Sequence, residues 1–272
     1  MKFSEYFTEE NEFLFIENVR EGKEPWSVLS SIPDIVEERI RCKASAIPRD
    51  FENYMWINAA TKPGGAIQEK SIMITRTAYT NSPFCDDELG VYIGAGTFLE
   101  AGAVIKGPCF IGEACQIRHG AYIRGSVIVG DESVIGHATE IKNSIVMDFS
   151  NAGHFNYLGD SILGSYSNMG AGSVFANLKF RSRDEIRTGK IKEILTTSHT
   201  GEPLQSGRDK LGAVIGDYTE IGCNTVVLPG AMVGSDCWIY PNTTLPRRIY
   251  PSGSVIRNKG ALDVECEKRP GL

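Results

Sequence analysis

A six-residue repeat of aliphatic side chains is the feature that most limits how this chain can fold. Six residues make about 1.67 turns of an α-helix, so a helix would scatter these positions around its axis. A flat strand has a period of two and would not leave the intervening positions so small and polar. A coiled strand with three short sides per turn fits the period, so the sequence predicts an all-β solenoid. The repeat occupies Ile93, Leu99, Ile105, Ile111, Ile117, Ile123, Val129, Ile135, Ile141 and Met147.

Three hexads form one coil of eighteen residues, and coils stack about 4.8 Å apart like strands in a sheet. This predicts one inward column formed by Ile93, Ile111, Val129 and Met147. Glycines and small residues between the aliphatic positions predict tight corners. The pattern loosens at 148–157, where Gly153 falls on an expected aliphatic position. It resumes at Leu163, Met169 and Phe175, breaks at 181–212, and returns with Ile215, Ile221, Val227, Val233, Ile239 and Leu245, for roughly seven to eight coils.

The repeat divides the chain into three parts. Residues 91–260 form the solenoid, with 181–212 as a long polar insertion between coils. Residues 1–90 predict a helical and irregular cap or connector, with helices over 13–19 and 26–40, interrupted at Pro33, and an irregular stretch over 46–90 that covers the open edge of the first coil. Residues 261–272 form a C-terminal tail.

Composition excludes several classes of protein. A formal net charge of -6 and the lack of a basic run interleaved with aromatics argue against a nucleic-acid binder. No apolar stretch is long enough to span a bilayer, and the acidic start lacks the apolar core of a signal peptide. The seven cysteines show no C-x-x-C pair, and their odd number together with the lack of an export signal favours a reducing cytoplasm.

The most informative local stretch lies where the repeat falters. It reads Gly153-His154-Phe155-Asn156-Tyr157-Leu158-Gly159-Asp160, followed by Asn168-Met169-Gly170-Ala171-Gly172 and then Ala176-Asn177-Leu178. Together with the hexads, these segments resemble the hexapeptide-repeat acetyltransferase domain of the bifunctional N-acetylglucosamine-1-phosphate uridylyltransferase/glucosamine-1-phosphate acetyltransferases. Leu178, which stands where the bacterial enzymes have Tyr, and the residues 208–217 that end the insertion are nearer the archaeal type of sugar-phosphate nucleotidylyltransferase/acetyltransferase.

The resemblance implies a left-handed parallel β-helix, a homotrimer, acetyl-CoA as co-substrate and an amino-sugar 1-phosphate as acceptor, within nucleotide-sugar biosynthesis. Glucosamine 1-phosphate and galactosamine 1-phosphate both remain open as acceptors. His154 falls at the general base. The positions that hold the sugar phosphate correspond to Arg124, Lys142, Tyr157 and Asn168, and those that hold the coenzyme to Ala171, Asn177, Cys223, Pro241 and Arg257.

These residue types suit the chemistry independently of the resemblance. An imidazole titrates near neutrality and can take the proton of an amine nucleophile. Arg124 and Lys142 are eighteen residues apart, hence one coil apart on the same side, where their cations can bind a phosphate. Backbone N–H groups at Gly170-Ala171-Gly172 can face the thioester oxygen. No Gly-rich pyrophosphorylase loop occurs in 1–90, so the sequence predicts no nucleotidyltransferase activity.

Two other classes of function remain open. Hexapeptide solenoids also serve as trimeric scaffolds, and residues 1–90 could then dock a separate sugar nucleotidyltransferase. A less favoured alternative is a zinc enzyme that resembles γ-type carbonic anhydrase. In that case His119 and His137, which are eighteen residues apart, would stack and bind zinc together with His154.

Overall fold

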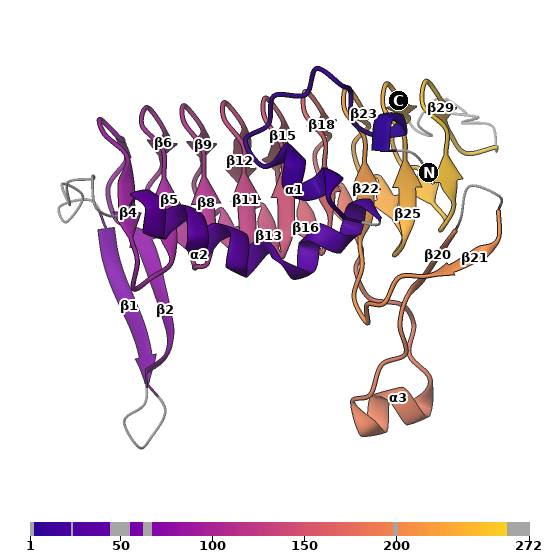
Figure 1. Cartoon of the computed structure of the whole chain (residues 1–272), viewed down its shortest axis with the longest axis horizontal. Coiled ribbons are helices and arrows are strands. Elements are labelled where there is room, and N and C mark those ends of the chain that lie inside the picture. Colours follow the sequence, from indigo (N-terminus) through magenta and orange to yellow (C-terminus); the bar gives the residue numbers. More distant parts are fainter. Residues whose placement is uncertain (1–2, 23, 44–54, 62–66, 198–200, 260–272) are drawn as a thin grey trace, which may run out of the picture.

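The computed structural model describes residues 3–22, 24–43, 55–61, 67–197 and 201–259, with the backbone alone for 42–43, 55–61 and 67–70. The predicted tail 261–272 lies outside the described residues. The described chain forms a three-sided parallel β-helix, which confirms the predicted fold class, a left-handed β-helix with a helical N-terminal segment (Figure 1). Each coil passes through sheet C, sheet B and sheet A in that order.

The three parallel sheets contain eight, eight and seven strands, in agreement with the predicted seven to eight coils. Sheet C contains β5 (Val91–Ile93), β8 (Cys109–Ile111), β11 (Val127–Val129), β14 (Ser144–Val146), β17 (Ile162–Leu163), β22 (Ala213–Ile215), β25 (Ala231–Val233) and β28 (Ile249–Tyr250). Sheet B contains β6 (Phe98–Leu99), β9 (Gln116–Ile117), β12 (Val134–His137), β15 (Asn151–His154), β18 (Asn168–Met169), β23 (Glu220–Ile221), β26 (Trp238–Ile239) and β29 (Val255–Ile256). Sheet A contains β7 (Val104–Ile105), β10 (Tyr122–Ile123), β13 (Glu140–Lys142), β16 (Tyr157–Gly159), β19 (Val174–Phe175), β24 (Val226–Val227) and β27 (Thr244–Leu245).

The predicted inward column is confirmed for Ile93, Ile111 and Val129, but the prediction is wrong for Met147. Val129 pairs with Val146 rather than with Met147, because this coil has seventeen residues. The lost residue lies at the corner between sheets A and C, where Asn143 alone (φ 45°) takes the place of Gly125-Ser126. Met147 is fully buried outside the solenoid, with its sulfur 3.6 Å from the Asn11 amide nitrogen.

Glycine is needed at some corners for close approach between coils rather than for a positive φ. A Cβ built on Gly136 would lie 1.7 Å from the Gly153 carbonyl oxygen of the next coil. A side chain at Gly112 is excluded in the same way, because a Cβ there would lie 2.8 Å from the Asp131 amide nitrogen of the next coil. The small residues of the repeat therefore follow from the spacing of the stacked backbones.

Four antiparallel strands close the N-terminal end of the solenoid: β1 (Met55–Thr61), β2 (Ile67–Ile74), β3 (Ala78–Tyr79) and β4 (Phe84–Asp86). Strands β2, β3 and β4 pair with β7, β6 and β5, so one antiparallel strand covers the first rung of each sheet. The part of 46–90 that the structure describes is therefore largely strand, where the turn-rich sequence suggested irregular backbone. This arrangement satisfies the backbone groups at the edge of the first coil.

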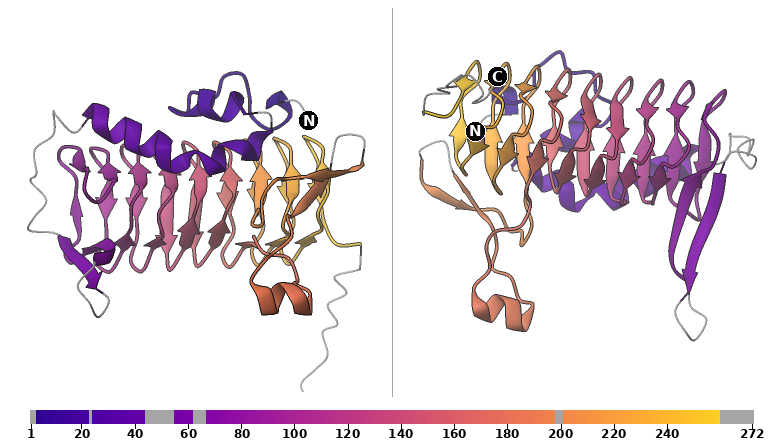
Figure 2. Two further views of the ribbon diagram at one scale, coloured as in Figure 1. Left: turned by 60° about the horizontal axis from the view of Figure 1, so that its bottom comes forward. Right: turned by 180° about the vertical axis from the view of Figure 1, so that it is seen from behind.

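The N-terminal residues 3–43, residue 23 apart, run along the outside of sheet C, and we call them the strap (Figures 1 and 2). Their helices are η1 (Phe3–Glu5), α1 (Ile16–Arg20), η2 (Pro25–Ser30) and α2 (Ile32–Lys43). Pro33 lies at the second position of α2, where its missing N–H costs nothing, so it begins the helix instead of interrupting one. A second hydrophobic core, separate from the one inside the coils, fills the space between the strap and sheet C.

The insertion leaves the solenoid after Asn177 and returns at Gly212, at the corner between sheets A and C. It contains α3 (Arg183–Thr188) and the hairpin of β20 (Leu195–Thr197) and β21 (Pro203–Gln205), and α3 stands away from the coils (Figure 1). None of the helices described here has the length and apolar character needed to cross a membrane.

Candidate functional site

His154 lies at the end of β15, at the corner where sheet B gives way to sheet A, and its side chain is exposed. The next residue, Phe155, has a left-handed backbone (φ 37°) that is uncommon for an aromatic residue. Asn156 fixes this corner, because its buried side chain accepts from the His154 amide (3.0 Å) and donates to the Gly170 carbonyl of the next coil (2.8 Å). The sequence analysis quoted Asn156 without a role, and the usual Asx turn would not have indicated one, because it bonds the amide two residues later and not two residues earlier.

Three histidines form a column along this corner, as the spacing predicts for His119 and His137. These two rings stack with centroids 5.7 Å apart. Each has its Nδ1 within hydrogen-bonding distance of the carbonyl oxygen one coil earlier, Ala101 for His119 (2.6 Å) and His119 for His137 (2.9 Å). Among the described residues, the ring of His154 makes no hydrogen bond and only neighbours Phe155, at 6.1 Å between centroids. Its nitrogens are therefore available to a ligand.

Zinc binding by these histidines has little support in the geometry. The contacts of the His119 and His137 Nδ1 atoms with backbone oxygens do not argue against zinc, because a histidine that binds zinc commonly donates its second ring N–H to a carbonyl. Within the described part of the chain, no three His, Cys, Asp or Glu side chains are grouped as metal ligands would be.

Three of the predicted coenzyme residues continue the histidine column toward the C-terminal end. The pairing of β15 with β18, of β18 with β23 and of β23 with β26 places His154, Ala171, Cys223 and Pro241 one above another. Neighbouring members are about 4.8 Å apart, so the row extends for about 15 Å. Arg257 is exposed in the last coil and lies one position before this row, beside Tyr240.

The backbone at Gly170-Ala171-Gly172 offers one free donor beside His154. The Gly170 amide donates to the Ile221 carbonyl (2.7 Å), and the Gly172 amide donates to the His154 carbonyl (3.1 Å). Within the described residues the Ala171 amide has no such partner. The predicted oxyanion donors are thus reduced to a single N–H group at this corner.

The predicted phosphate and sugar residues, apart from Asn168, lie on the outer face of sheet A. Arg124 and Lys142 are one coil apart, as their spacing predicts. Arg124 forms an exposed ion pair with Glu140 (2.6 Å), and this hydrogen bond raises the pKa of the guanidinium. Tyr157 pairs in register with Glu140, and burial raises the pKa of its hydroxyl above the ordinary value. The two predicted cations therefore belong to one column, and the Glu140 carboxylate lies in the adjacent column of the same face.

Asn168 lies on the outer face of sheet B and donates to Glu220 (3.2 Å). Tyr157 lies three residues after His154 on sheet A, and Asn168 pairs with Asn151, three residues before it, on sheet B. The two residues therefore lie on either side of the His154 corner in different sheets, but the Tyr157 hydroxyl reaches away from it, toward Gly159 and Asn177. They are not in contact with each other.

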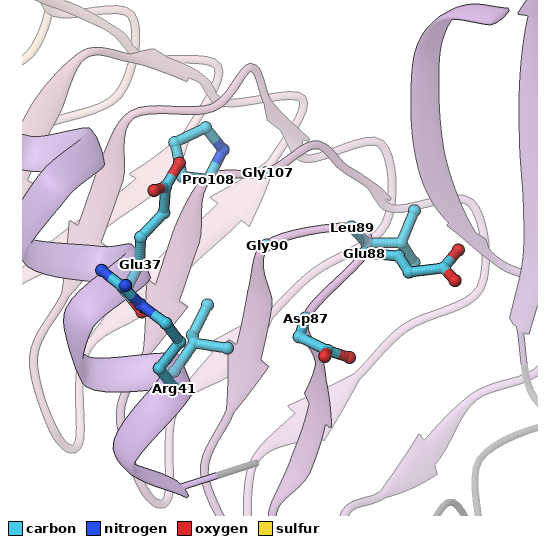
Figure 3. Close-up of a pocket in the computed structure, with 9 residues that line it drawn as sticks. Glu37, Arg41, Asp87, Glu88, Leu89, Gly90, Gly107 and Pro108 are labelled. Carbon is cyan, nitrogen blue, oxygen red and sulfur yellow. The ribbon is translucent and has the colours of Figure 1, made fainter.

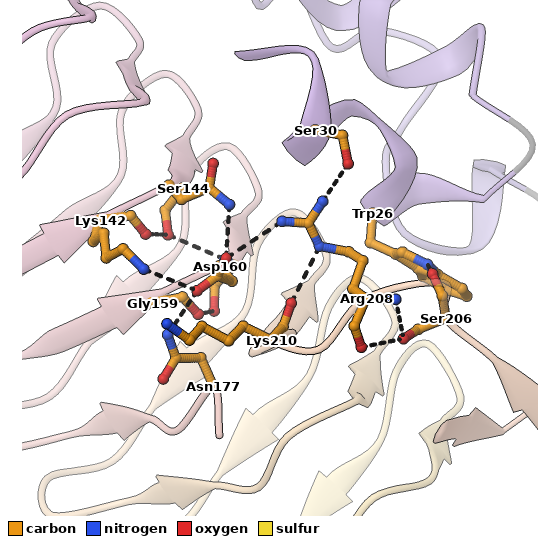
Figure 4. A network of polar contacts seen from close by, with 12 residues as sticks. Trp26, Ser30, Lys142, Ser144, Gly159, Asp160, Asn177, Ser206, Arg208 and Lys210 are labelled. Carbon is orange, nitrogen blue, oxygen red and sulfur yellow. Dashed lines mark hydrogen bonds and ion pairs between the residues drawn. The ribbon is translucent and has the colours of Figure 1, made fainter. Parts of the chain in front are cut away.

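Lys142 and Asn177 meet at the opposite corner, between sheets A and C, around the carboxylate of Asp160 (Figure 4). The Asn177 amide donates to Asp160 at 2.6 Å, and the Lys142 ammonium lies 3.9 Å from it. Gly159 makes room for this cluster, since a Cβ there would lie 2.5 Å from the Tyr157 hydroxyl and 2.6 Å from the Asn177 amide nitrogen. The sequence analysis assigned no role to Asp160.

The predicted site residues thus fall into two groups within one chain. His137, the register partner of His154, and Lys142 are five positions apart along the chain, with the corner at Ala138 between them. At about 3.3 Å per residue, the backbones at these two positions are at most on the order of 15 Å apart. A single sugar ring is shorter than that distance and does not span the two backbone positions of one chain.

Two hollows lie away from these residues. One of about 420 Å³, between α2 and the first coils, is lined by Glu37, Arg41, Asp87 and Pro108, among others (Figure 3). Another of about 470 Å³ lies between the strap and the corner that joins sheets C and B, and its lining includes Asp148 and Asp217. Neither contains a predicted site residue.

Comparison with known proteins agrees with the resemblance predicted from the sequence. The family model described as the GMPPB C-terminal domain matches residues 105–184, a range that includes every predicted catalytic and sugar-binding residue. The bifunctional sugar-1-phosphate nucleotidylyltransferase/acetyltransferase of Sulfurisphaera tokodaii is 34% identical over 108 residues, which are 40% of this chain and 24% of that protein. The bifunctional protein GlmU of Methanococcus vannielii is 37% identical over 116 residues, 43% of this chain and 25% of that protein.

The chain therefore matches about a quarter of the length of these relatives. Among solved structures, the Francisella novicida UDP-N-acetylglucosamine acyltransferase aligns with a TM-score of 0.42 at 18% identity, over 57% of this chain and 52% of that one.

Proposed function

We propose that this protein is an acetyl-CoA-dependent N-acetyltransferase whose acceptor is an amino-sugar 1-phosphate, either glucosamine or galactosamine 1-phosphate, in nucleotide-sugar biosynthesis. The observation that carries the proposal is an exposed imidazole without a hydrogen-bond partner in the described chain, at the head of the row Ala171, Cys223 and Pro241. The similarity to bifunctional sugar-1-phosphate nucleotidylyltransferase/acetyltransferases over this part of the chain supports it.

In this proposal His154 is the general base. The free amine of the sugar attacks the thioester carbonyl carbon, and the imidazole takes the proton that the nitrogen loses. The C–S bond then breaks, and the proton passes from the imidazole to the leaving CoA sulfur. The Ala171 amide, free within the described residues, is positioned beside the imidazole to stabilise the oxyanion. Such a base contributes on the order of 10² to 10⁴ in rate.

The coenzyme lies along the row from Ala171 to Pro241 in this proposal, with Asn177 and Arg257 as further contacts. The sugar phosphate is held by Arg124, Lys142, Tyr157 and Asn168. Because the backbone positions of the cations and of His154 in one chain are on the order of 15 Å apart, we propose a homotrimer in which a crevice between two copies brings His154 of one copy close to the cations of the other.

The test is CoA release from acetyl-CoA with a panel of amino-sugar phosphates. We expect His154→Ala to lower turnover at least 100-fold. His137→Ala is the matched control, since its ring lies one coil away and contacts the His119 carbonyl, and it should keep wild-type activity. Equal losses in both variants would contradict the role of His154.

The scaffold alternative predicts a different result in the same assay. A scaffold would neither bind CoA in calorimetry nor release thiol with any sugar phosphate. We further propose that the chain has no nucleotidyltransferase activity, so a UDP-sugar formed from UTP by the purified chain would contradict this part of the proposal.

A further inference from the structure

Asp160 is a buried carboxylate that lies among four nitrogen donors from three parts of the chain. Its side chain is 4% exposed, and its backbone is left-handed (φ 49°). A buried carboxylate is costly unless it is paired and hydrogen-bonded. The donors are the side chains of Asn143 (2.7 Å), Asn177 (2.6 Å) and Arg208 (3.3 Å), together with the ammonium of Lys142 at 3.9 Å.

The two oxygens of this carboxylate have different neighbours (Figure 4). Oδ1 accepts from Asn143 and from Arg208, which belongs to the end of the insertion. Oδ2 accepts from Asn177 and faces Lys142, which are both residues of the proposed ligand groove. Oδ1 is thus held by Asn143 and Arg208, which have no proposed ligand. Oδ2 contacts Asn177 and Lys142, which the proposed function assigns to the coenzyme and the sugar phosphate.

Arg208 holds the Oδ1 side of the carboxylate in place. Its guanidinium also donates to the Ser30 hydroxyl of the strap and to the Lys210 carbonyl (3.2 Å). Close by, the Trp26 indole of the strap donates to the Ser206 carbonyl (3.2 Å). Arg208 lies closer to Asp160 than Lys142 does and is the more buried of the two, with 16% of its side chain exposed against 29%. The ammonium of Lys142 is therefore not the main compensation for the buried charge.

The Asp160 contacts determine what the two groove residues can offer a ligand. An ionised carboxylate only accepts hydrogen bonds, so Asn177 must turn its NH₂ toward Asp160 and its carbonyl oxygen away from it. Lys142 has three N–H donors and directs one side of its ammonium at Asp160, which leaves donors for an anion. Gly159, next to Asp160, leaves the space in which these tips and the Tyr157 hydroxyl converge.

We propose that Asp160 is the positioning residue of the groove, which orients Asn177 as an acceptor for the coenzyme and Lys142 as a donor to the sugar phosphate. Its own position is fixed by the insertion and the strap through Arg208. This inference rests on the proposed function. Asp160 acts through its neighbours and does not touch the reacting atoms.

The test compares Asp160→Asn with the wild type in the CoA-release assay. The substituted amide has the same shape but adds donors that oppose those of Asn177 or Arg208. We expect the KM for acetyl-CoA and for the sugar phosphate to rise about tenfold. We expect kcat to change less than about threefold, because Asp160 acts on binding groups and does not touch the reacting atoms. A purely structural role would lower the folded fraction and leave both KM values unchanged.

Asp217→Asn is the matched control, because Asp217 is equally buried but accepts from neutral donors of the strap and its neighbouring coil. It should lower the melting temperature without changing either KM. Crystal structures of both variants give a readout that does not need activity. In Asp160→Asn the Asn177 and Lys142 side chains should turn away from their positions while the backbone stays in place.

The outcomes are distinguishable. If the wild type releases no CoA with any acceptor, the proposed function fails, and the crystal structures alone decide whether Asp160 orients its neighbours. If the wild type is active and Asp160→Asn has wild-type KM values, or if Asn177 and Lys142 keep their positions in the variant crystal, Asp160 is not a positioning residue.

Discussion

Asp160 and Asp217 are both buried carboxylates that follow a glycine at a corner of the solenoid, yet their partners differ in kind. Asp160 has Arg208 and Lys142 beside it, together with two amides. Asp217 accepts from the Thr8 amide (2.8 Å), from Asn11 (3.0 Å) and from the Ser165 amide (2.8 Å). In the described chain no cation pairs with Asp217, and burial raises its pKa above the ordinary value.

The difference separates a structural anchor from a group that can respond to a ligand. All the donors of Asp217 are neutral and belong to the strap or to a neighbouring coil, so they are fixed by the fold. Lys142 is a flexible side chain that is 29% exposed, and it can divide its donors between Asp160 and an incoming anion. Substitutions beside Asp217 should therefore change stability, and those beside Asp160 should change binding.

The largest effect should come from Gly216→Ala, next to Asp217. A Cβ at this position would lie 2.5 Å from the Ser235 amide nitrogen and 2.6 Å from the Tyr6 carbonyl oxygen of the strap. These backbone atoms are fixed by the stacked coils and cannot move away from the added methyl group. We therefore expect the free energy of unfolding, measured in urea, to fall by about 3 kcal/mol. Gly153→Ala, where an added methyl meets nothing within 4 Å, is the control and should lose much less. Comparable losses in both would break the comparison.

A smaller effect, and one of another kind, is expected for Gly159→Ala next to Asp160. Here the added methyl meets the tips of two side chains, Tyr157 and Asn177, which can move. We expect the KM values in the CoA-release assay to rise about tenfold, or about 1.4 kcal/mol, with less than about 1 kcal/mol of stability lost. A variant that unfolds as readily as Gly216→Ala would show that both corners serve structure alone.

The smallest effect should come from Asp148→Asn, in the same corner column as Asp217. Burial raises the pKa of Asp148 to about 6, with Asp131, Glu12 and Glu132 adding to the shift and the Asp131 amide opposing it. Because the folded protein binds this proton more tightly than the unfolded chain does, the Asp148 carboxyl stabilises the fold below its unfolded pKa and loses that contribution as the pH rises through about 6.

The Asn variant should therefore be more stable than the wild type at pH 8 by about 1 kcal/mol, a figure reduced for the partial exposure of the group. It should match the wild type at pH 4. Urea unfolding at the two pH values measures the difference. A gain that is the same at both pH values would show that the carboxylate charge is not its cause.

The hexad spacing predicted the sheets, the break at the insertion and the row that contains His154. This was possible because an aliphatic residue recurs every six positions and its place in a coil follows from counting along the chain. It could not locate the shortened coil, since Met147 is apolar and satisfies either register while its true environment is the strap. The cluster at Asp160 was equally hidden. The partners Arg208 and Ser30 are 178 residues apart and meet only in the folded chain.

The contacts of the strap also set the order in which the chain can mature. The Ser252 hydroxyl donates to the carbonyl of Glu5, a residue that leaves the ribosome 247 positions earlier. The coils can stack as they emerge, since each rung pairs with the one before it. The residues near Glu5 have no such neighbour, and they cannot reach their partners until these later coils have been synthesised. These strap residues are thus made well before their partners and are among the last to be paired.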